Sequence, residues 1–144
     1  MMKKCLCFLA ILVLACGLRA AALAANSQAL KGLKLQELGL RRYNTRTQEF
    51  TRTDDEVSLS DLAFGEHYTP WLRLRNDRNY DVHVTVRIDV TGDDSYSVEW
   101  PETVVPSKGY WFFYMTEEVG RGALTCRWYI DDVFLAERTF TVSE

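Results

Sequence analysis

Residues 81–90 read DVHVTVRIDV, and two kinds of side chain alternate along this stretch. Every second residue is a branched aliphatic one, and the residues between them are polar or charged. Successive side chains of a β-strand point to opposite faces, so this alternation is typical of a strand with one buried face. The aliphatic face consists of Val82, Val84, Val86, Ile88 and Val90.

The preceding stretch, WLRLR at residues 71–75, alternates in the same way. Leu72 and Leu74 point to one side, and the other side carries Trp71, Arg73 and Arg75. The link NDRNY at 76–80 is rich in turn formers and predicts a hairpin between the two strands. Arginine beside tryptophan favours a cation–π pair, although the same face is also a candidate for ligand recognition.

Alternation continues after residue 90. TGDD at 91–94 predicts a turn, SYSVEW at 95–100 a strand, and PETVVPSKG at 101–109 a loop. Residues 123–130 alternate again, with Cys126 on the same side as Leu124, Trp128 and Ile130. A free cysteine in that company behaves as a small hydrophobic side chain, so we expect a buried and inert thiol.

The stretch GYWFFYMT at 109–116 contains six consecutive large apolar or aromatic residues. As a strand it has two apolar faces, of which Trp111, Phe113 and Met115 form the better core face because they carry fewer polar groups. The opposite face consists of Tyr110, Phe112 and Tyr114. This second face is either covered by the N-terminal segment or a loop, or it is a contact surface for a partner.

The C-terminal stretch predicts one more hairpin, with a two-residue turn at Asp131 and Asp132. Val133 and Leu135 then face the core, but Phe140 and Val142 have the opposite parity. A bulge between Ala136 and Thr139 would reconcile them, and without it Arg138 points inward.

The N-terminal third is less regular. LKLQELGLRRY is expected to form a strand with a kink at Gly39, followed by short strands in TQEFTRT and VSLSDLAFG. A helix over residues 27–38 is a weaker alternative, because Gly32 disfavours it. Seven to nine short strands predict an all-β fold, an antiparallel two-sheet sandwich rather than a barrel.

The C-terminal half resembles bacterial extracytoplasmic immunoglobulin-like domains of uncharacterised exported proteins. The stretch WYIDDVFLAERTFTV is similar to their last hairpin, and ELGLRRY and FGEHYTPWLRLRND are similar to the opening of small exported domains. The resemblance implies an immunoglobulin-like sandwich and carries no catalytic residues. Those domains often have glycine in the last turn, where this chain has Asp132.

The first 26 residues, MMKKCLCFLAILVLACGLRAAALAAN, have the three parts of a secretory signal peptide. We expect residues 1–25 to be a cleaved signal peptide and residues 26–144 to be one domain. Cleavage after Ala24 or Ala25 gives a soluble periplasmic or secreted protein. Alternatively VLACG resembles a lipoprotein box, in which Cys16 becomes lipidated and anchors the protein to a membrane.

Loss of the leader removes three of the 17 basic residues and no acid, which leaves 14 basic against 20 acidic residues. The basic residues gather in 31–52, interspersed with other types, which indicates a solvated strand face and no nucleic-acid partner. Three of the four cysteines lie in the leader. Cleavage at Ala24 or Ala25 therefore leaves no internal disulfide.

The chemistry of common enzymes is absent from the sequence. His67 and His83 lack metal-cluster spacing, and neither a nucleophile elbow nor a phosphate loop occurs. The aspartate pairs sit at predicted turns, although TGDD could contribute to a calcium site. We therefore expect no enzyme activity, cofactor or metal.

The sequence favours an exported module that acts through contact with another protein in the cell envelope. The candidate binding residues are those of the second aromatic face and of the Trp–Arg face: Tyr110, Phe112, Tyr114, Trp71, Arg73 and Arg75. The alternative is a carbohydrate-binding module that uses Trp71, Tyr110 or Tyr114 as stacking platforms.

Overall fold

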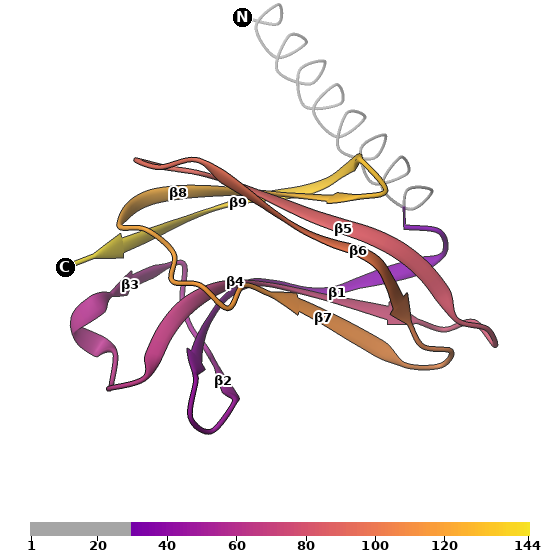
Figure 1. The fold of residues 1–144 in the computed structure, drawn as a ribbon, viewed down its shortest axis with the longest axis horizontal. Helices are drawn as coiled ribbons and strands as arrows, with labels where there is room; N and C mark the ends of the chain where they lie inside the picture. The colour runs from indigo at the N-terminus through magenta and orange to yellow at the C-terminus, as the bar shows by residue number, and fades with distance from the viewer. Residues whose placement is uncertain (1–29) are drawn as a thin grey trace, which may run out of the picture.

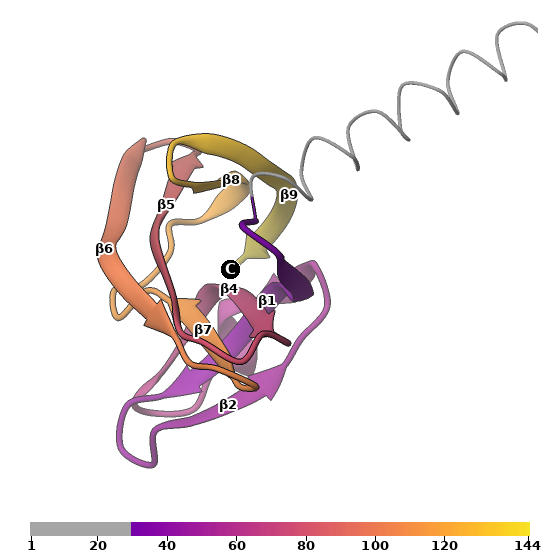
Figure 2. The ribbon, with the colours of Figure 1, turned by 90° about the vertical axis from the view of Figure 1, so that its right-hand side faces the viewer.

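The structure, a computed structural model, describes residues 30–144 as two packed β-sheets (Figure 1). One sheet has the strand order β2 (Glu49–Arg52), β1 (Leu33–Asn44), β4 (Glu66–Asn76), β7 (Tyr110–Tyr114). The other has the order β3 (Glu56–Ser58), β9 (Val133–Ser143), β8 (Gly122–Ile130), β5 (Val82–Thr91), β6 (Tyr96–Val105). A short 3₁₀ helix, η1 (Leu59–Asp61), joins β3 to β4. The end view shows the strands of the two sheets on either side of the interior (Figure 2).

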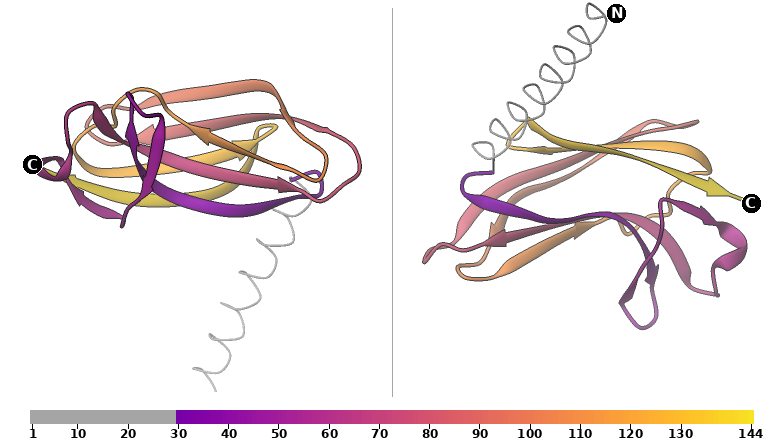
Figure 3. Two further views of the ribbon diagram at one scale, coloured as in Figure 1. Left: turned by 90° about the horizontal axis from the view of Figure 1, so that it is seen from below. Right: turned by 180° about the vertical axis from the view of Figure 1, so that it is seen from behind.

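The strand order confirms the predicted immunoglobulin-like sandwich. From β4 to β9 the strands follow the immunoglobulin order B, C, C′, E, F, G, so that β4 and β7 share one sheet and β9, β8, β5 and β6 share the other. The hairpin through the TGDD turn joins β5 to β6, as expected. Edge strands β6 and β7 run along one side of the sandwich, and β9 and β1 along the opposite side (Figures 1 and 3).

The predicted hairpin between residues 71–75 and 81–90 is wrong. β4 and β5 belong to different sheets, so the link at 76–80 carries the chain across the sandwich. Asn76 fixes this crossing, because its buried amide donates to the carbonyls of Tyr80 (2.8 Å) and Val105 (3.1 Å). The predicted loop at 101–109 is also partly wrong, since β6 continues to Val105 after a bulge.

The last hairpin turns at Asp131 and Asp132, as predicted, and both residues have positive φ angles (48° and 64°). The bulge lies at Leu135, just before the predicted interval, because Tyr129 pairs with Phe134 and Trp128 with Ala136. Leu135, Phe140 and Val142 are buried, whereas Val133 is exposed near the hairpin tip, contrary to expectation. Arg138 consequently lies on the core side of its strand, opposite Cys126.

The N-terminal third contains the three predicted strands. The irregularity in β1 lies between Leu35 and Glu37, where the pairing with β4 shifts, and not at Gly39. The alternative helix is wrong for residues 33–38, which belong to β1; residues 27–29 lie outside the described residues.

The core lies between the sheets and includes the predicted Val84, Val86, Leu124 and Trp128, each at most 2% exposed. Burial of one such side chain contributes about 1.5–3 kcal/mol. Cys126 is fully buried, as predicted, and burial raises its pKa to about 12. It is a free thiol, and the facing strand β4 holds Leu72 and Leu74 and no cysteine.

No helix in residues 30–144 is long and apolar enough to cross a bilayer. The predicted signal peptide, both cleavage sites and Cys16 lie outside the described residues.

Candidate functional site

The outer face of the four-stranded sheet carries an aromatic cluster built from all four of its strands. Its members are Tyr43 of β1, Phe50 of β2, Trp71 of β4, and Phe112 and Tyr114 of β7. Phe50 lies at the centre, with its ring centroid 4.6 Å from that of Tyr43, 4.8 Å from Trp71 and 4.7 Å from Tyr114. Each pair of aromatic rings at such a distance stabilises the fold by about 0.5–1.5 kcal/mol beyond the effect of buried area.

The cluster shows that the face formed by Tyr110, Phe112 and Tyr114 is partly covered. Strand β2 supplies Phe50, so a segment N-terminal to β4 does cover part of the second aromatic face. Trp71 stacks against Phe112 at 4.8 Å and is only 7% exposed. It points away from the core, as predicted, but the rings around it shield it from solvent. Tyr114 is half-buried, and burial raises the pKa of its phenol, with a further contribution from Tyr43.

Three consecutive residues at the start of β7 remain exposed to solvent. Tyr110 is 50% exposed, Trp111 47% and Phe112 36%. We call these three residues the exposed strip. Phe113 and Met115 are buried in the core, as predicted for their face, but Trp111 is not. Trp111 lies near the end of an edge strand, where its ring is nearly parallel to that of Phe112 with 6.2 Å between centroids.

The three predicted site residues of β4 have separate surroundings. The guanidinium of Arg73 lies 3.9 Å from the ring centroid of Tyr110, so this arginine belongs beside the exposed strip. Arg75 instead forms an exposed ion pair with Asp77 (2.7 Å). The predicted cation–π contact of Trp71 exists, but its partner is Arg41 of β1, at 5.3 Å from the ring centroid.

Two buried nitrogen atoms beneath the cluster have no hydrogen-bond partner within residues 30–144. They are Nε1 of Trp71 and Nε2 of His67, and His67 is itself 4% exposed and edge-on to Tyr43. The packed rings leave little of the centre of this face exposed, since Trp71 is 7% and Tyr43 9% exposed. What remains for contact is the exposed strip with Arg73.

Sequence reasoning missed Tyr43, Phe50 and Trp111 as parts of this surface. Tyr43 and Phe50 pair across the β1–β2 hairpin, directly opposite each other. Aromatic residues at matching positions before and after the TRT turn segment could have indicated this pair.

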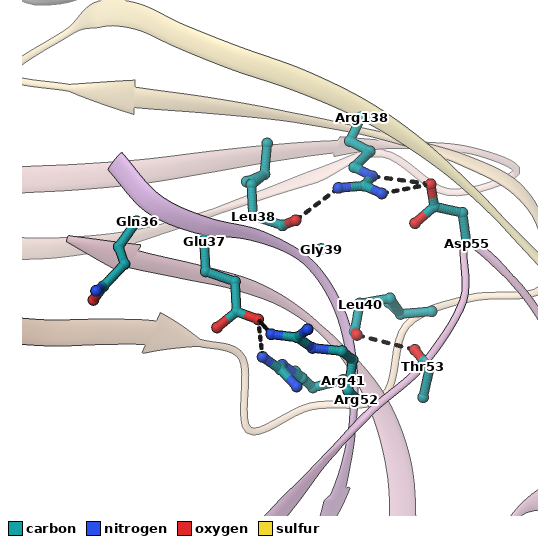
Figure 4. A pocket seen from close by; sticks show the side chains of 10 residues that line it. All are labelled: Gln36, Glu37, Leu38, Gly39, Leu40, Arg41, Arg52, Thr53, Asp55 and Arg138. Atoms are coloured by element: carbon teal, nitrogen blue, oxygen red, sulfur yellow. Dashed lines mark hydrogen bonds and ion pairs between the residues drawn. The ribbon is translucent and has the colours of Figure 1, made fainter. Parts of the chain in front are cut away.

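A concavity of about 350 Å³ lies at the opposite side of the sandwich, between β1, β9 and residues 52–55 (Figure 4). Its charged side chains are paired with one another. Burial would raise the pKa of Glu37, but hydrogen bonds from Arg41 and Arg52 outweigh it and keep that pKa lowered. Arg138 donates to the Leu38 carbonyl (2.7 Å) and pairs with Asp55 (2.9 Å). The charged side chains of this concavity therefore form a network of ion pairs that joins the two sheets.

Within residues 30–144 no group of three or more His, Cys, Asp or Glu side chains could hold a metal ion, and this includes the TGDD turn.

No protein-family model and no curated protein matches the chain. The solved structures that are similar to it include two Pseudomonas proteins. One is the Pseudomonas fluorescens alkylpurine DNA glycosylase AlkC bound to DNA containing an abasic site analog (11% identity, TM-score 0.48), of which the match covers 34%, and 83% of this chain. The other is an immunoglobulin-like protein from Pseudomonas aeruginosa (16% identity, TM-score 0.46), with 95% of that protein and 76% of this chain covered. The chain thus spans about a third of the length of the first, and the fold assignment rests on the strand order.

Proposed function

We propose that this chain is a non-catalytic immunoglobulin-like module that binds protein through the exposed strip of β7. The observation that carries the proposal is the run of three adjacent, solvent-exposed aromatic residues, Tyr110 to Phe112, on the terminal strand of a sheet. A contiguous apolar patch on a soluble protein is typical of an interaction site. Tyrosine, tryptophan and arginine are also the residues enriched at binding hot spots.

The packing around the exposed strip supports this function. Phe112 stacks on the shielded Trp71, and Arg73 lies over Tyr110, so two of the three rings are held in place before any partner arrives. A contact surface that is ordered beforehand loses less conformational entropy on binding.

The place of action that we propose is outside the cytoplasm, in the cell envelope. The leader-like pattern of residues 1–25 supports it. Lipidation at Cys16 is the alternative form of the same protein, and intact-mass measurement of the isolated protein distinguishes the two. A soluble N-terminus at Ala25 or Asn26 supports peptidase cleavage, whereas a mass that includes acyl chains on Cys16 supports the anchored form.

Carbohydrate binding is less well supported than protein binding. A sugar ring stacks on an accessible aromatic face, but Trp71 is shielded by its neighbours and Tyr114 is half-buried. Of the three stacking platforms expected from the sequence, Tyr110 is the one that remains open, and Arg73 lies over its ring.

The test is affinity capture from envelope extracts with the wild-type protein, a Trp111→Ala variant and a Phe134→Ala variant. Phe134 is a matched control, because it is equally exposed (47%) but lies on β9 of the other sheet. We expect Trp111→Ala to lose specific protein partners that Phe134→Ala retains. Identical partner sets for all three proteins, or a glycan-array signal that depends on Trp111, would overturn the proposal.

A further inference from the structure

We propose that β7 pairs with the β7 of a second copy of this chain, antiparallel and edge to edge, so that their four-stranded sheets become one continuous sheet. This inference rests on the proposed function, because it names the partner that the exposed strip receives.

Among the sheet edges of residues 30–144, that of β7 is the unprotected one. Natural edge strands carry charges, proline or bulges that prevent pairing with another chain. β2 has Glu49 and Arg52, β3 has Glu56, and β6 has a bulge with Pro101 and Glu102. β7 reads YWFFY, without charge or proline, and pairs with β4 without a register shift.

The remaining edges are also protected. Where β1 extends beyond β2, side chains occupy its carbonyls: Arg138 donates to Leu38 (2.7 Å) and Thr53 donates to Leu40 (2.9 Å). Where β9 extends beyond β3 it carries Glu137 and Arg138. The absence of such a device on β7 is therefore a property of this strand and not of the fold.

The backbone of β7 offers a regular ladder to a partner strand. The N–H of Asn76 donates to the carbonyl of Gly109 at 2.8 Å. Hydrogen-bonded pairs alternate along an antiparallel ladder, so Trp111 and Phe113 direct their backbone groups toward β4. Tyr110, Phe112 and Tyr114 then direct theirs toward the open edge.

A register centred on Phe112 satisfies both the backbone directions and the side-chain faces. Directly opposite residues of an antiparallel pair share a face, and a slip by one residue reverses the faces. Pairing Phe112 with the Phe112 of the second copy places Tyr110 opposite Tyr114, and all of these rings lie on the outer face. A two-fold axis through Phe112 generates this arrangement, which is the commonest symmetry of soluble dimers.

The charges next to the strand ends favour the antiparallel orientation. Lys108 precedes β7, and Glu117 and Glu118 follow it; none of the three forms an ion pair within the part of the chain that the structure describes. The two-fold arrangement brings Lys108 of one copy beside Thr116 and Glu117 of the other. A parallel arrangement would place like charges together.

The experiment is a charge exchange at the two-fold axis, followed by sedimentation velocity of the isolated protein over a range of concentrations. The wild type is expected to form a concentration-dependent dimer. Phe112→Glu and Phe112→Lys each place like charges directly opposite one another, and should weaken the dimer about tenfold or more. An equimolar mixture of these two variants should dimerise again, which a mere loss of folding in either variant could not produce.

A cysteine variant tests the register independently. Hydrogen-bonded pairs have Cα atoms about 5.5 Å apart, within the range of about 4.4–6.8 Å that a disulfide spans. Under mild oxidation Phe112→Cys should give a dimer in which the tryptic peptide 109–121 is linked to itself. The control Phe134→Cys, at a more exposed position on the other sheet (47% against 36% for Phe112), should not.

A wild type that stays monomeric at all concentrations would overturn the inference. So would a dimer that neither charge variant weakens, or a mixture that fails to restore it. If the protein is monomeric but still captures another protein through Trp111, the proposed function stands and the self-pairing falls. If the wild type is monomeric and Trp111→Ala also loses no protein partner, both fall.

Discussion

At the scale of single residues, Asp132 is the residue of the last hairpin whose backbone conformation has least support from its contacts. Its φ is 64°, in the left-handed region, and its carboxylate contacts one guanidinium, that of Arg87, at 2.6 Å. Asp131 has the same conformation, but its carboxylate accepts from the Thr85 N–H (2.9 Å) and its own N–H donates to the Thr85 carbonyl (2.8 Å). Asp131 therefore attaches the turn to the backbone of β5, whereas Asp132 contacts only a side chain of that strand.

We expect Asp132→Gly to be more stable than Asp132→Ala by about 1 kcal/mol, because alanine retains the steric cost of the left-handed region and glycine does not. Both variants lose the carboxylate, so the comparison isolates the backbone. Urea unfolding followed by tryptophan fluorescence measures the difference. Equal midpoints for the two variants would contradict this explanation, and Asp131→Gly serves as a control that should gain nothing because it loses the bond to Thr85.

Single residues also mark where sequence reasoning stops. Period-two alternation correctly predicted the directions of two side chains: Trp71 points to the outer face and Trp111 to the core face. It could not tell that Phe50 and Phe112 shield Trp71, or that Trp111 lies too near the end of an edge strand to be covered. The side a residue faces is local information, whereas its exposure depends on what the rest of the chain brings to that side.

At the scale of elements, strands were predictable and their partners were less so. Residues 71–75 and 81–90 are both strands, but the polar link between them crosses from one sheet to the other. A short run of turn formers is compatible with a hairpin and with such a crossing. What separates the two is the buried amide of Asn76 and its bond to the Val105 carbonyl, a contact between positions far apart in the sequence.

Arg138 of β9 contacts β1 and so joins the two sheets along one side of the sandwich. Its guanidinium donates to the Leu38 carbonyl (2.7 Å) and pairs with Asp55 (Figure 4). We expect Arg138→Ala to destabilise the fold by about 1 kcal/mol, since it removes a charged hydrogen bond that is partly exposed to solvent. Thermal unfolding followed by circular dichroism measures this loss.

The neighbouring Arg127 is the matched control for this prediction. It pairs with Glu137 (2.5 Å) on the outer side of the same hairpin and joins no elements of different sheets. Arg127→Ala should leave the melting temperature nearly unchanged, because exposed ion pairs contribute little. If the two variants lower the melting temperature equally, the contact of Arg138 between the two sheets does not explain its contribution to stability.

At the scale of the whole molecule, the described domain holds its two sheets together without a disulfide. Cys126 of β8 faces the core, and the opposing strand β4 supplies leucines in place of a second cysteine. The sequence predicted both the sandwich and this buried thiol, because both follow from alternation alone. It could not predict which sheet edge is left open, since that depends on the order of the strands.

Cys126 therefore reports on opening of the entire sandwich. Burial raises its pKa to about 12, so the thiol stays protonated at pH 8, and reagent reaches it only when the sheets separate. In native buffer iodoacetamide should leave the tryptic peptide 122–127 unlabelled, and in urea it should label it fully. Arg138→Ala should speed labelling in native buffer, because this variant is less stable and a larger fraction of its molecules is unfolded at any time. Rapid labelling of the wild type below its melting temperature would instead show that the core opens locally at β8.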